Sequence, residues 1–173
     1  SPQRNKVSVE FLELHAKTFN EYLAAEKLKE ILRRRAQARQ TNSPGRERYR
    51  KIAKTVVCVG EDGQTVFRQP EGLWLEVVPE SNPCNLRVGD SLEARVLFQG
   101  KPLARGRLVA GYAGVTGHHY PIQTLTDAEG RARVRLDRPG VWFLRVLHMV
   151  PAARDGEADW HSAFSTLTFE VSP

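Results

Sequence analysis

The stretch RARVRLDRPGVWFLRVLHMV, residues 131–150, decides the fold class. At its start three arginines alternate with Ala132, Val134 and Leu136, which is the two-residue period of a strand with one wet face and one buried face. The DRPG that follows is a turn sequence. The bulky apolar run after it is typical of a central strand packed on both faces. A strand, a turn and a further strand in close succession are the pattern of an antiparallel β fold.

Short strands with turn residues between them recur on both sides of this stretch. Further strands are predicted at residues 73–78, 91–98, 103–112, 120–126 and 162–171. About seven strands in a hundred residues is the count of an immunoglobulin-like sandwich. The Cys…Trp…Cys framework of antibody domains is missing. We therefore predict that residues 72–173 form an antiparallel β-sandwich of immunoglobulin type that is not an antibody-type domain.

The first 71 residues predict an incomplete β lobe with one helical insertion. Residues 7–14 alternate apolar and polar side chains as a half-buried strand does. A helix is predicted over residues 18–36, because Thr18 and Glu21 have the spacing of a capping box and apolar residues follow at helical spacing. After a loop at residues 40–45, a strand is predicted at residues 52–59, with a short partner at residues 65–68. These elements do not close a core, so we expect the lobe (residues 1–71) to lean on the sandwich.

The net charge of +6 lies entirely in this first part of the chain. Residues 1–71 carry 15 Lys+Arg and 9 Asp+Glu, whereas residues 72–173 carry 11 of each. Residues 33–54 hold nine basic residues and one acid, Glu47. Such a run suggests an anionic partner, but it is also typical of a solvated helix end. The motifs of nucleic-acid-binding modules are missing, so no nucleic acid is expected as a partner.

Two observations bear on location. No run of about 18 apolar residues exists, so no membrane span is predicted, and the chain opens with SPQRNK rather than with Met or a signal peptide. We expect a leader to have been removed. Cys58 and Cys84 are either ordinary buried thiols or, in an oxidising compartment, one disulfide whose constraint would contribute about 3 kcal/mol on the chain-entropy model.

Longer segments carry a family resemblance. They are GLWLEVVPESNPCNLRVGDSLEARVLFQGKPLARGRLVAGYAG, TLTDAEGRARVRLDRPGVWFLRVLHMV and DWHSAFSTLTFEV, and the likeness reaches back to FNEYLAAEKL and SPGRERYRKIAKTVVCVG. Together they resemble a bacterial extracytoplasmic family of unknown function linked by association to nickel and cobalt uptake transporters, the NikM-like periplasmic component. The resemblance implies a periplasmic or otherwise extracytoplasmic location, a membrane transporter component as partner, and a divalent metal or metal complex as ligand. The resemblance also implies a secretion signal and a first β-domain that includes a His-containing segment near the mature amino terminus. We expect any metal ligand from that segment to be missing from this sequence.

The histidines are the candidate metal ligands. His118 and His119 are adjacent in a loop, and imidazole suits nickel, cobalt, copper and zinc. Neighbouring residues of an extended chain point to opposite faces, so both bind one ion only if the loop bends. The alternative is that they are exposed loop histidines.

A second candidate metal set lies where two predicted strands meet. His148 ends an apolar face, and the loop at residues 151–160 connects its strand to Asp159 and His161. Two histidines and one carboxylate could hold a divalent metal with open positions. The alternative for His148 is a hydrogen-bonded residue at the edge of the core.

Two other functions are considered. Trp160 could stack on a sugar in a carbohydrate-binding module, whereas Trp142, in mid-strand, is expected to be core. A ligand-free structural or adhesive module is also compatible with the sandwich. No catalytic motif is present, and Asp155, Glu157 and Asp159 share one polar loop where solvation accounts for them, so an enzyme is not expected.

Overall fold

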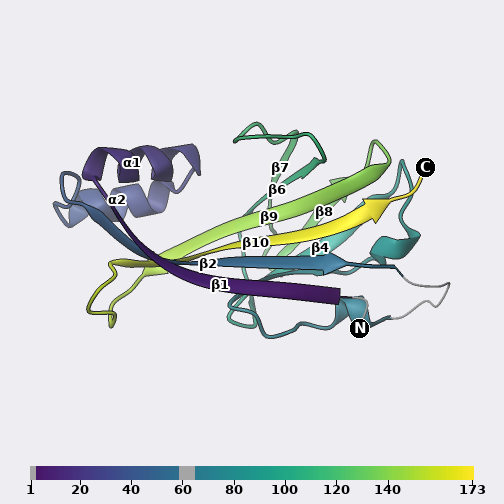
Figure 1. The fold of residues 1–173 in the computed structure, drawn as a ribbon, viewed down its shortest axis with the longest axis horizontal. Coiled ribbons are helices and arrows are strands. Elements are labelled where there is room, and N and C mark those ends of the chain that lie inside the picture. Colours follow the sequence, from purple (N-terminus) through teal and green to yellow (C-terminus); the bar gives the residue numbers. More distant parts are fainter. Residues whose placement is uncertain (1–2, 59–64) are drawn as a thin grey trace.

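The computed structural model describes residues 3–58 and 65–173, and it consists of two β-sheets and two helices. Figure 1 shows the helices at one end of the long strands and both termini toward the other end. The helices are α1 (Ala16–Ala25) and α2 (Lys29–Gln37), and the strands are β1 (Gln3–Leu14), β2 (Gly45–Val56), β3 (Leu75–Pro79), β4 (Ser91–Phe98), β5 (Lys101–Pro102), β6 (Arg107–Tyr112), β7 (Ile122–Leu125), β8 (Arg131–Arg135), β9 (Gly140–Pro151) and β10 (Trp160–Val171). The prediction of a mainly β chain built on a β-sandwich is confirmed.

The strand order within the sheets is that of an immunoglobulin-type sandwich. The long sheet has the order β1-β2-β10-β9-β6-β7, and in the short sheet β4 pairs with β3, β5 and β8. Counted from β3, strands β3, β4 and β8 take the places of strands A, B and E, while β6, β9 and β10 take those of C, F and G. β7 is an added strand beside β6.

Strands β1 and β2 widen the long sheet beyond this arrangement. β2 pairs with β10 in parallel, and β1 pairs with β2 in antiparallel orientation. The sheet therefore continues across the boundary predicted at residue 72, and the first part of the chain has no sheet of its own among the described residues. The division into two domains stays a prediction.

Two predicted strands of the first part need correction. The strand predicted at residues 52–59 is present but has other bounds and ends at Val56, and residue 59 lies outside the described residues. β2 begins at Gly45 rather than at residue 52, because its first half carries alternate arginines whose charge masks the strand pattern. Residues 65–68 form a single 3₁₀ turn, Thr65–Arg68, and not a strand. Phe67 is buried in this turn, which packs against β3.

The single helix predicted over residues 18–36 is instead two helices. α1 ends in a Schellman motif, in which Lys27 N–H bonds to Ala24 O and Leu28 N–H to Leu23 O, and Lys27 adopts a φ of 61°. The predicted capping box was also wrong. α1 begins at Ala16, before Thr18, and its N-cap residue His15 makes no side-chain capping hydrogen bond.

The break in the helix lets both helices cover the same end of the long sheet. Phe19 and Leu23 of α1 and Ile31 of α2 form a small cluster with Met149 and Trp160 of the sheet. The main core lies between the two sheets and includes Trp142, which is fully buried as predicted.

A disulfide joins Cys58, just after β2, to Cys84 in the 3₁₀ turn Pro83–Asn85. Of the two alternatives that the sequence left open, buried thiols or a disulfide, the structure contains the disulfide. Nearby, Lys54 of β2 and Glu76 of β3 form an ion pair in which each side chain is at most 2% exposed. Both links fasten β2 to the sandwich.

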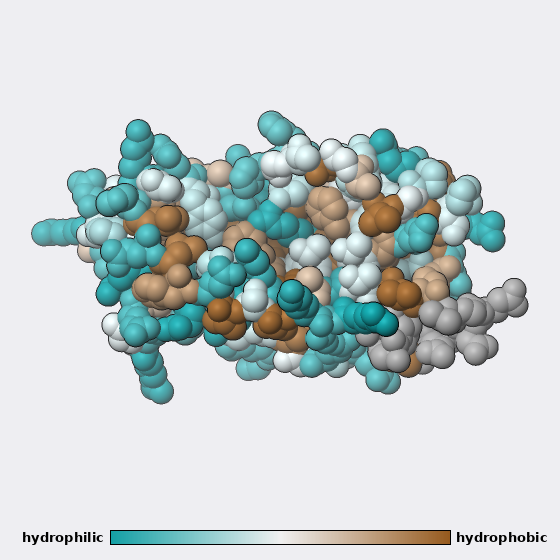
Figure 2. All heavy atoms as spheres, viewed as in Figure 1, coloured by the Kyte–Doolittle hydropathy of each residue, from teal (hydrophilic) through white to brown (hydrophobic). Residues whose placement is uncertain are grey.

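Among the described residues no helix is long and apolar enough to cross a membrane. On the face in Figure 2, apolar patches are broken up by hydrophilic side chains. Several of these patches lie in the lower middle, where Figure 1 draws β1, and Val7, Val9 and Phe11 of β1 are each about half exposed.

Candidate functional site

Strand register brings His148 and His161 to the same face of the long sheet. Ala163 of β10 lies directly opposite His148 of β9, and His161 is two residues before Ala163. Because residues two apart in a strand share a face, the two histidines are diagonal neighbours. The parallel pairing places Arg48 opposite His161 and Arg50 opposite Ala163. This end of the sheet therefore carries two histidines and two arginines on its sandwich-facing side.

His148 is half-buried and packs against aromatic rings. Its ring meets Phe98 of β4 at 4.6 Å between centroids, Phe98 meets Trp74 at 4.8 Å, and the Arg50 guanidinium lies 4.6 Å from the Trp74 centroid. Burial lowers the pKa of His148 below its ordinary value, because the charged imidazolium loses solvation there. His148 is therefore neutral at pH 7. The stack closes this end of the core.

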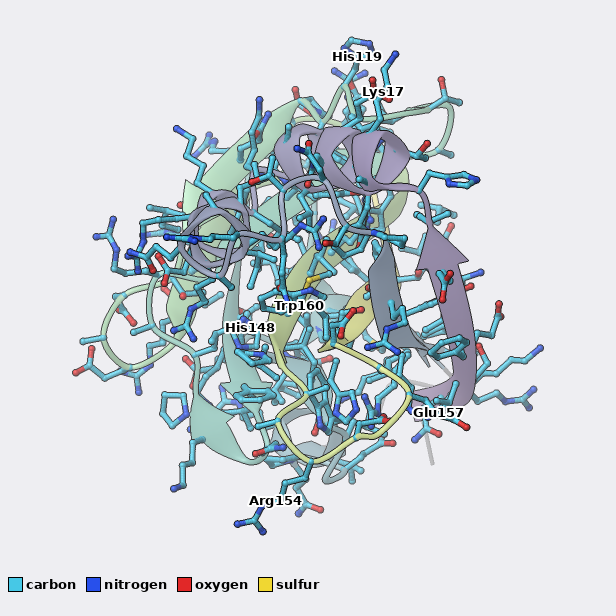
Figure 3. The ribbon with its side chains drawn as sticks, turned by 90° about the vertical axis from the view of Figure 1, so that its left-hand side faces the viewer. Lys17, His119, His148, Arg154, Glu157 and Trp160 are labelled. Carbon is cyan, nitrogen blue, oxygen red and sulfur yellow. A yellow bond between two sulfur atoms is a disulfide. The ribbon has the colours of Figure 1, made fainter. Side chains whose placement is uncertain are left out.

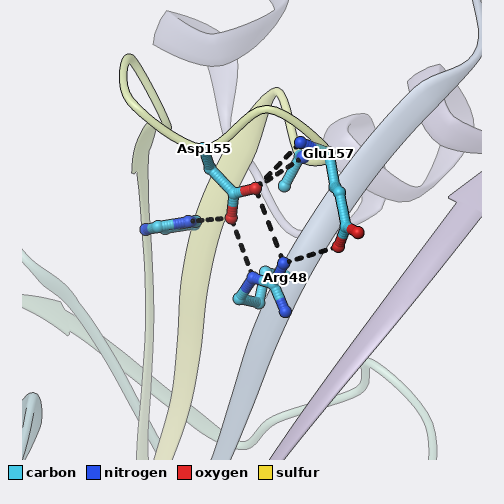
Figure 4. Close-up of polar contacts among 5 residues, drawn as sticks. Arg48, Asp155 and Glu157 are labelled. Carbon is cyan, nitrogen blue, oxygen red and sulfur yellow. Dashed lines mark hydrogen bonds and ion pairs between the residues drawn. The ribbon is translucent and has the colours of Figure 1, made fainter.

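His161 belongs to a polar cluster with Asp155, drawn in Figure 4. Its Nε2 lies 2.8 Å from Asp155 Oδ2, and Arg48 Nε donates to the same oxygen at 2.8 Å. Asp155 Oδ1 accepts the backbone N–H groups of Glu157 and Ala158. The hydrogen bonds from Arg48 and His161, followed by those from the backbone, hold the pKa of the Asp155 carboxyl far below its ordinary value. Asp155 is thus a fixed carboxylate that orients His161.

Asp159 does not join the histidines. Its carboxylate accepts from Arg46, with Oδ1 2.8 Å from Nη2, so Asp155 lies where the sequence predicted Asp159. Over residues 3–58 and 65–173 no group of three or more His, Cys, Asp or Glu side chains is arranged to hold a metal ion. The register makes His148 and His161 diagonal neighbours on one face, whereas Asp159, the third member of the predicted set, pairs with Arg46.

His118 and His119 lie elsewhere. Figure 3 draws His119 at the periphery of the view, whereas His148 and Trp160 lie nearer its centre. His118 is exposed, with its Nδ1 3.5 Å from Glu26 Oε1. The two predicted histidine sets are therefore separate.

Trp160 is buried beneath the helices and is only 5% exposed. It packs in the cluster with Phe19, Leu23, Ile31 and Met149, and its Nε1 has no hydrogen-bond partner in the described part of the chain. A buried indole offers no face to a sugar. The carbohydrate-binding alternative therefore loses the residue on which it depended.

The basic run at residues 33–54 is largely matched by acids inside the fold. Arg33 and Arg34 bond to Glu30, and three more pairs join Arg46 to Asp159, Arg48 to Asp155 and Lys54 to Glu76. The buried Arg35 donates to Asn20 and to the carbonyl of Ser43, with its guanidinium over the Phe19 ring. This run therefore needs no external anion to account for it.

Sequence reasoning missed Asp155 as a partner of His161 and missed Glu47 altogether. Asp155 is followed by Gly156, which marks a turn but not the strand that the turn faces. Glu47 is buried on β2, where it accepts from Tyr22 and Ser162. Its one sequence signal is that it is the single acid in the basic run.

Fold and strand order define this chain as an immunoglobulin-type β-sandwich protein with a two-stranded, two-helix N-terminal addition. It belongs to the family described as a domain of unknown function, DUF4198, whose family model matches residues 5–150. The match includes most of β1, all of β2 and both helices. Neither a curated protein nor a solved structure matches the chain.

Proposed function

We propose that this protein is an extracytoplasmic binding protein that holds a divalent transition metal, or a complex of one, between His148 and His161. The observation that carries the proposal is the strand register, which makes these two side chains diagonal neighbours on one face of β9 and β10. Diagonal Cα atoms in such a pair are about 7–8 Å apart, within the span of two imidazoles that share one ion. Nickel, cobalt, copper and zinc all accept imidazole nitrogen.

The surroundings of the pair supply what metal-binding histidines need. A neutral imidazole binds metal, and His148 is kept neutral by burial. His161 is held by Asp155, and a carboxylate on the second ring nitrogen is the usual way to orient a histidine ligand. Two protein ligands leave positions open for water or for a chelator that arrives with the metal, so a metal complex fits as well as a bare ion.

The disulfide supports an extracytoplasmic location, because such bridges persist in oxidising compartments. Delivery of the metal to a membrane transporter component is the part of the proposal that comes from the sequence resemblance. In this role the protein binds and hands over its ligand without catalysing a reaction.

Calorimetric titration with nickel, cobalt, copper and zinc tests the proposal. The wild type is expected to bind one ion of at least one of these metals, and His148→Ala or His161→Ala should weaken binding at least tenfold, which is about 1.4 kcal/mol. Asp155→Asn should weaken binding by roughly 10–100-fold through the orientation of His161.

His15→Ala is the matched control, because His15 is exposed and lies at the start of α1. It should leave the affinity within about twofold of the wild type. If no metal binds below high micromolar concentration, or if His15→Ala weakens binding as much as His148→Ala, the metal site is wrong. A ligand-free structural module would then be the better description.

A further inference from the structure

A groove of about 270 Å³ lies between the helices and the long sheet, separate from the polar cluster of His161. One wall is residues 26–31, which join α1 to α2 and form the start of α2. The facing walls come from Arg105, Arg107 and Val109 and from four residues of β9, namely Arg145, Leu147, His148 and Met149. We call it the cationic groove. Its lining brings together Lys27 and Lys29 with two arginines almost eighty residues later in the chain.

The acids in this lining are already matched by arginines. Glu26 Oε1 lies 3.1 Å from Arg145 Nη2. Glu30 Oε1 lies 2.6 Å from Arg33 Nη2 and 2.9 Å from Arg34 Nε. Neither carboxylate is left to neutralise another cation of the groove.

Four cations of the groove have no acidic partner in the described part of the chain. Lys27, Lys29 and Arg105 make no ion pair, and the Arg107 guanidinium donates to the neutral amide oxygen of Gln123 at 2.8 Å. A concave surface with an excess of unpaired charges of one sign concentrates the field and attracts the opposite charge. This arrangement differs from that of the basic run at residues 33–54, where ion pairs within the fold neutralise most of the charge.

Backbone geometry gives a second, independent observation. Among the described residues only four non-glycine residues have a positive φ, and two of them, Lys27 (61°) and Arg105 (56°), line the groove. Lys27 follows the last turn of α1, a position that glycine fills most easily. Residues held in such conformations concentrate at binding sites. The positive φ strains the Lys27 backbone, and the favourable interaction of the Lys27 charge with the C-terminal end of the α1 dipole offsets part of that strain.

We propose that the cationic groove binds a small anion with two or more negative charges on carboxylate or phosphate oxygens. Arginine presents a fork of donors that fits either group, and lysine adds compact charge. A volume of about 270 Å³ holds roughly nine groups of the size of water. Pyrophosphate and citrate are therefore suitable probes of the two oxygen chemistries.

Titration of the whole chain with pyrophosphate and with citrate tests the site, in metal-free buffer at constant ionic strength. The wild type should bind at least one of them with a Kd below about 1 mM. Binding of only one probe would assign the chemistry to phosphate or to carboxylate. His148 lines the groove and is also a proposed metal ligand, but the buffer holds no metal and none of the four cations is a proposed metal ligand. Anion binding can therefore fail while the metal site stands, and metal binding can fail while the anion site stands.

Charge removal at the groove is compared with equal removal elsewhere. Lys29→Gln combined with Arg105→Gln should weaken binding at least tenfold. Arg133→Gln combined with Arg135→Gln removes the same charge from exposed, unpaired arginines on β8 and should change the Kd less than twofold. Equal losses in both variants, or no binding by the wild type, would overturn the proposal.

Lys27 and Arg39, the residues that follow α1 and α2, provide a matched pair of variants. Arg39 follows α2 as Lys27 follows α1, with a φ of 56°, but it does not line the groove. Lys27→Gly and Arg39→Gly should each raise the Tm by about 2–4 °C, since glycine accepts this conformation freely. Only Lys27→Gly should weaken anion binding, by at least threefold. If Arg39→Gly weakens it equally, or if Lys27→Gly leaves it unchanged, the lysine has no part in the site.

Discussion

Glu47 is a buried carboxylate with hydroxyl partners and no ion pair among the described residues. It lies on β2 beneath α1, is 1% exposed, and accepts from Ser162 and from Tyr22, whose oxygen is 3.2 Å away. Burial raises the pKa of Glu47, while the two hydrogen bonds act in the opposite direction. Burial and the nearby negative charge of Glu47 in turn raise the pKa of Tyr22. The ionised form of Glu47 therefore destabilises the folded state.

The sign of the resulting pH dependence follows from proton counting. In the unfolded chain Glu47 loses its proton near its ordinary pKa of about 4.3, but in the folded protein it loses it only at higher pH. As pH rises between these two values the folded state binds more protons, so the free energy of unfolding falls. Below the unfolded pKa this penalty is absent, and above the folded pKa it is constant.

Glu47→Gln removes this penalty. The difference in Tm between Glu47→Gln and the wild type should become more favourable to the variant from pH 4 to pH 7, in thermal unfolding followed by circular dichroism. Glu129→Gln, at an exposed loop carboxylate, should show a nearly constant difference. A Glu47→Gln difference that is flat or declines with pH would contradict the expected effect of burial.

Among the elements, β2 links the first part of the chain to the sandwich. It is hydrogen-bonded to β1 on one side and to β10 on the other, and it carries Lys54 to Glu76 in the short sheet. Its first half places Arg46 and Arg48 against acids of the loop between β9 and β10. The disulfide begins two residues after its end. Loss of that bridge should therefore loosen the attachment of β2 to the sandwich.

Removal of the disulfide should lower the free energy of unfolding by about 3.5 kcal/mol, the chain-entropy value for a closed loop of this length. Urea unfolding of the wild type with and without a reductant measures the change. The variant Cys58→Ser with Cys84→Ser should match the reduced wild type and should not respond to reductant. Sensitivity of that variant to reductant, or equal stability of the oxidised and reduced wild type, would be inconsistent with this role.

At the scale of the whole molecule one core spans both parts of the chain. Ile52 and Val56 of β2 are buried in the same cluster as Leu92, Val134 and other residues of the sandwich. A second, smaller cluster ties both helices to β9 and β10. Since neither part buries its apolar surface without the other, we expect them to unfold together.

Differential scanning calorimetry should therefore give one transition, with equal calorimetric and van't Hoff enthalpies. Ile52→Ala should lower that single Tm, because it removes buried apolar volume from the shared core. Two separable transitions, with only the first shifted by Ile52→Ala, would instead support the division of the chain at residue 72.

Of the eight strands after residue 72, seven could be predicted because their signal is local, whereas the two-residue β5 was not predicted. The alternation of polar and apolar residues in β8 and the run of large apolar residues in β9 indicate which faces are buried. This signal does not depend on which strand packs opposite. The early part of β2 escaped prediction because its arginines look like a solvated run until the acids at residues 155–159 are placed beside them. Of the candidate site, the sequence identified His148 and His161 but selected Asp159 instead of Asp155, since a loop does not reveal which of its carboxylates turns inward.

The sequence by itself determined the sandwich, the mainly β class and the absence of apolar runs long enough to span a membrane, since each is written in short-range pattern. Only the tertiary structure decided that the two cysteines are bonded, that the basic run is matched by internal acids, and that unpaired positive charge collects between the helices and the long sheet. These outcomes depend on contacts between residues tens of positions apart. Charge and sulfur chemistry have no periodicity, so their partners become visible only when the chain is folded.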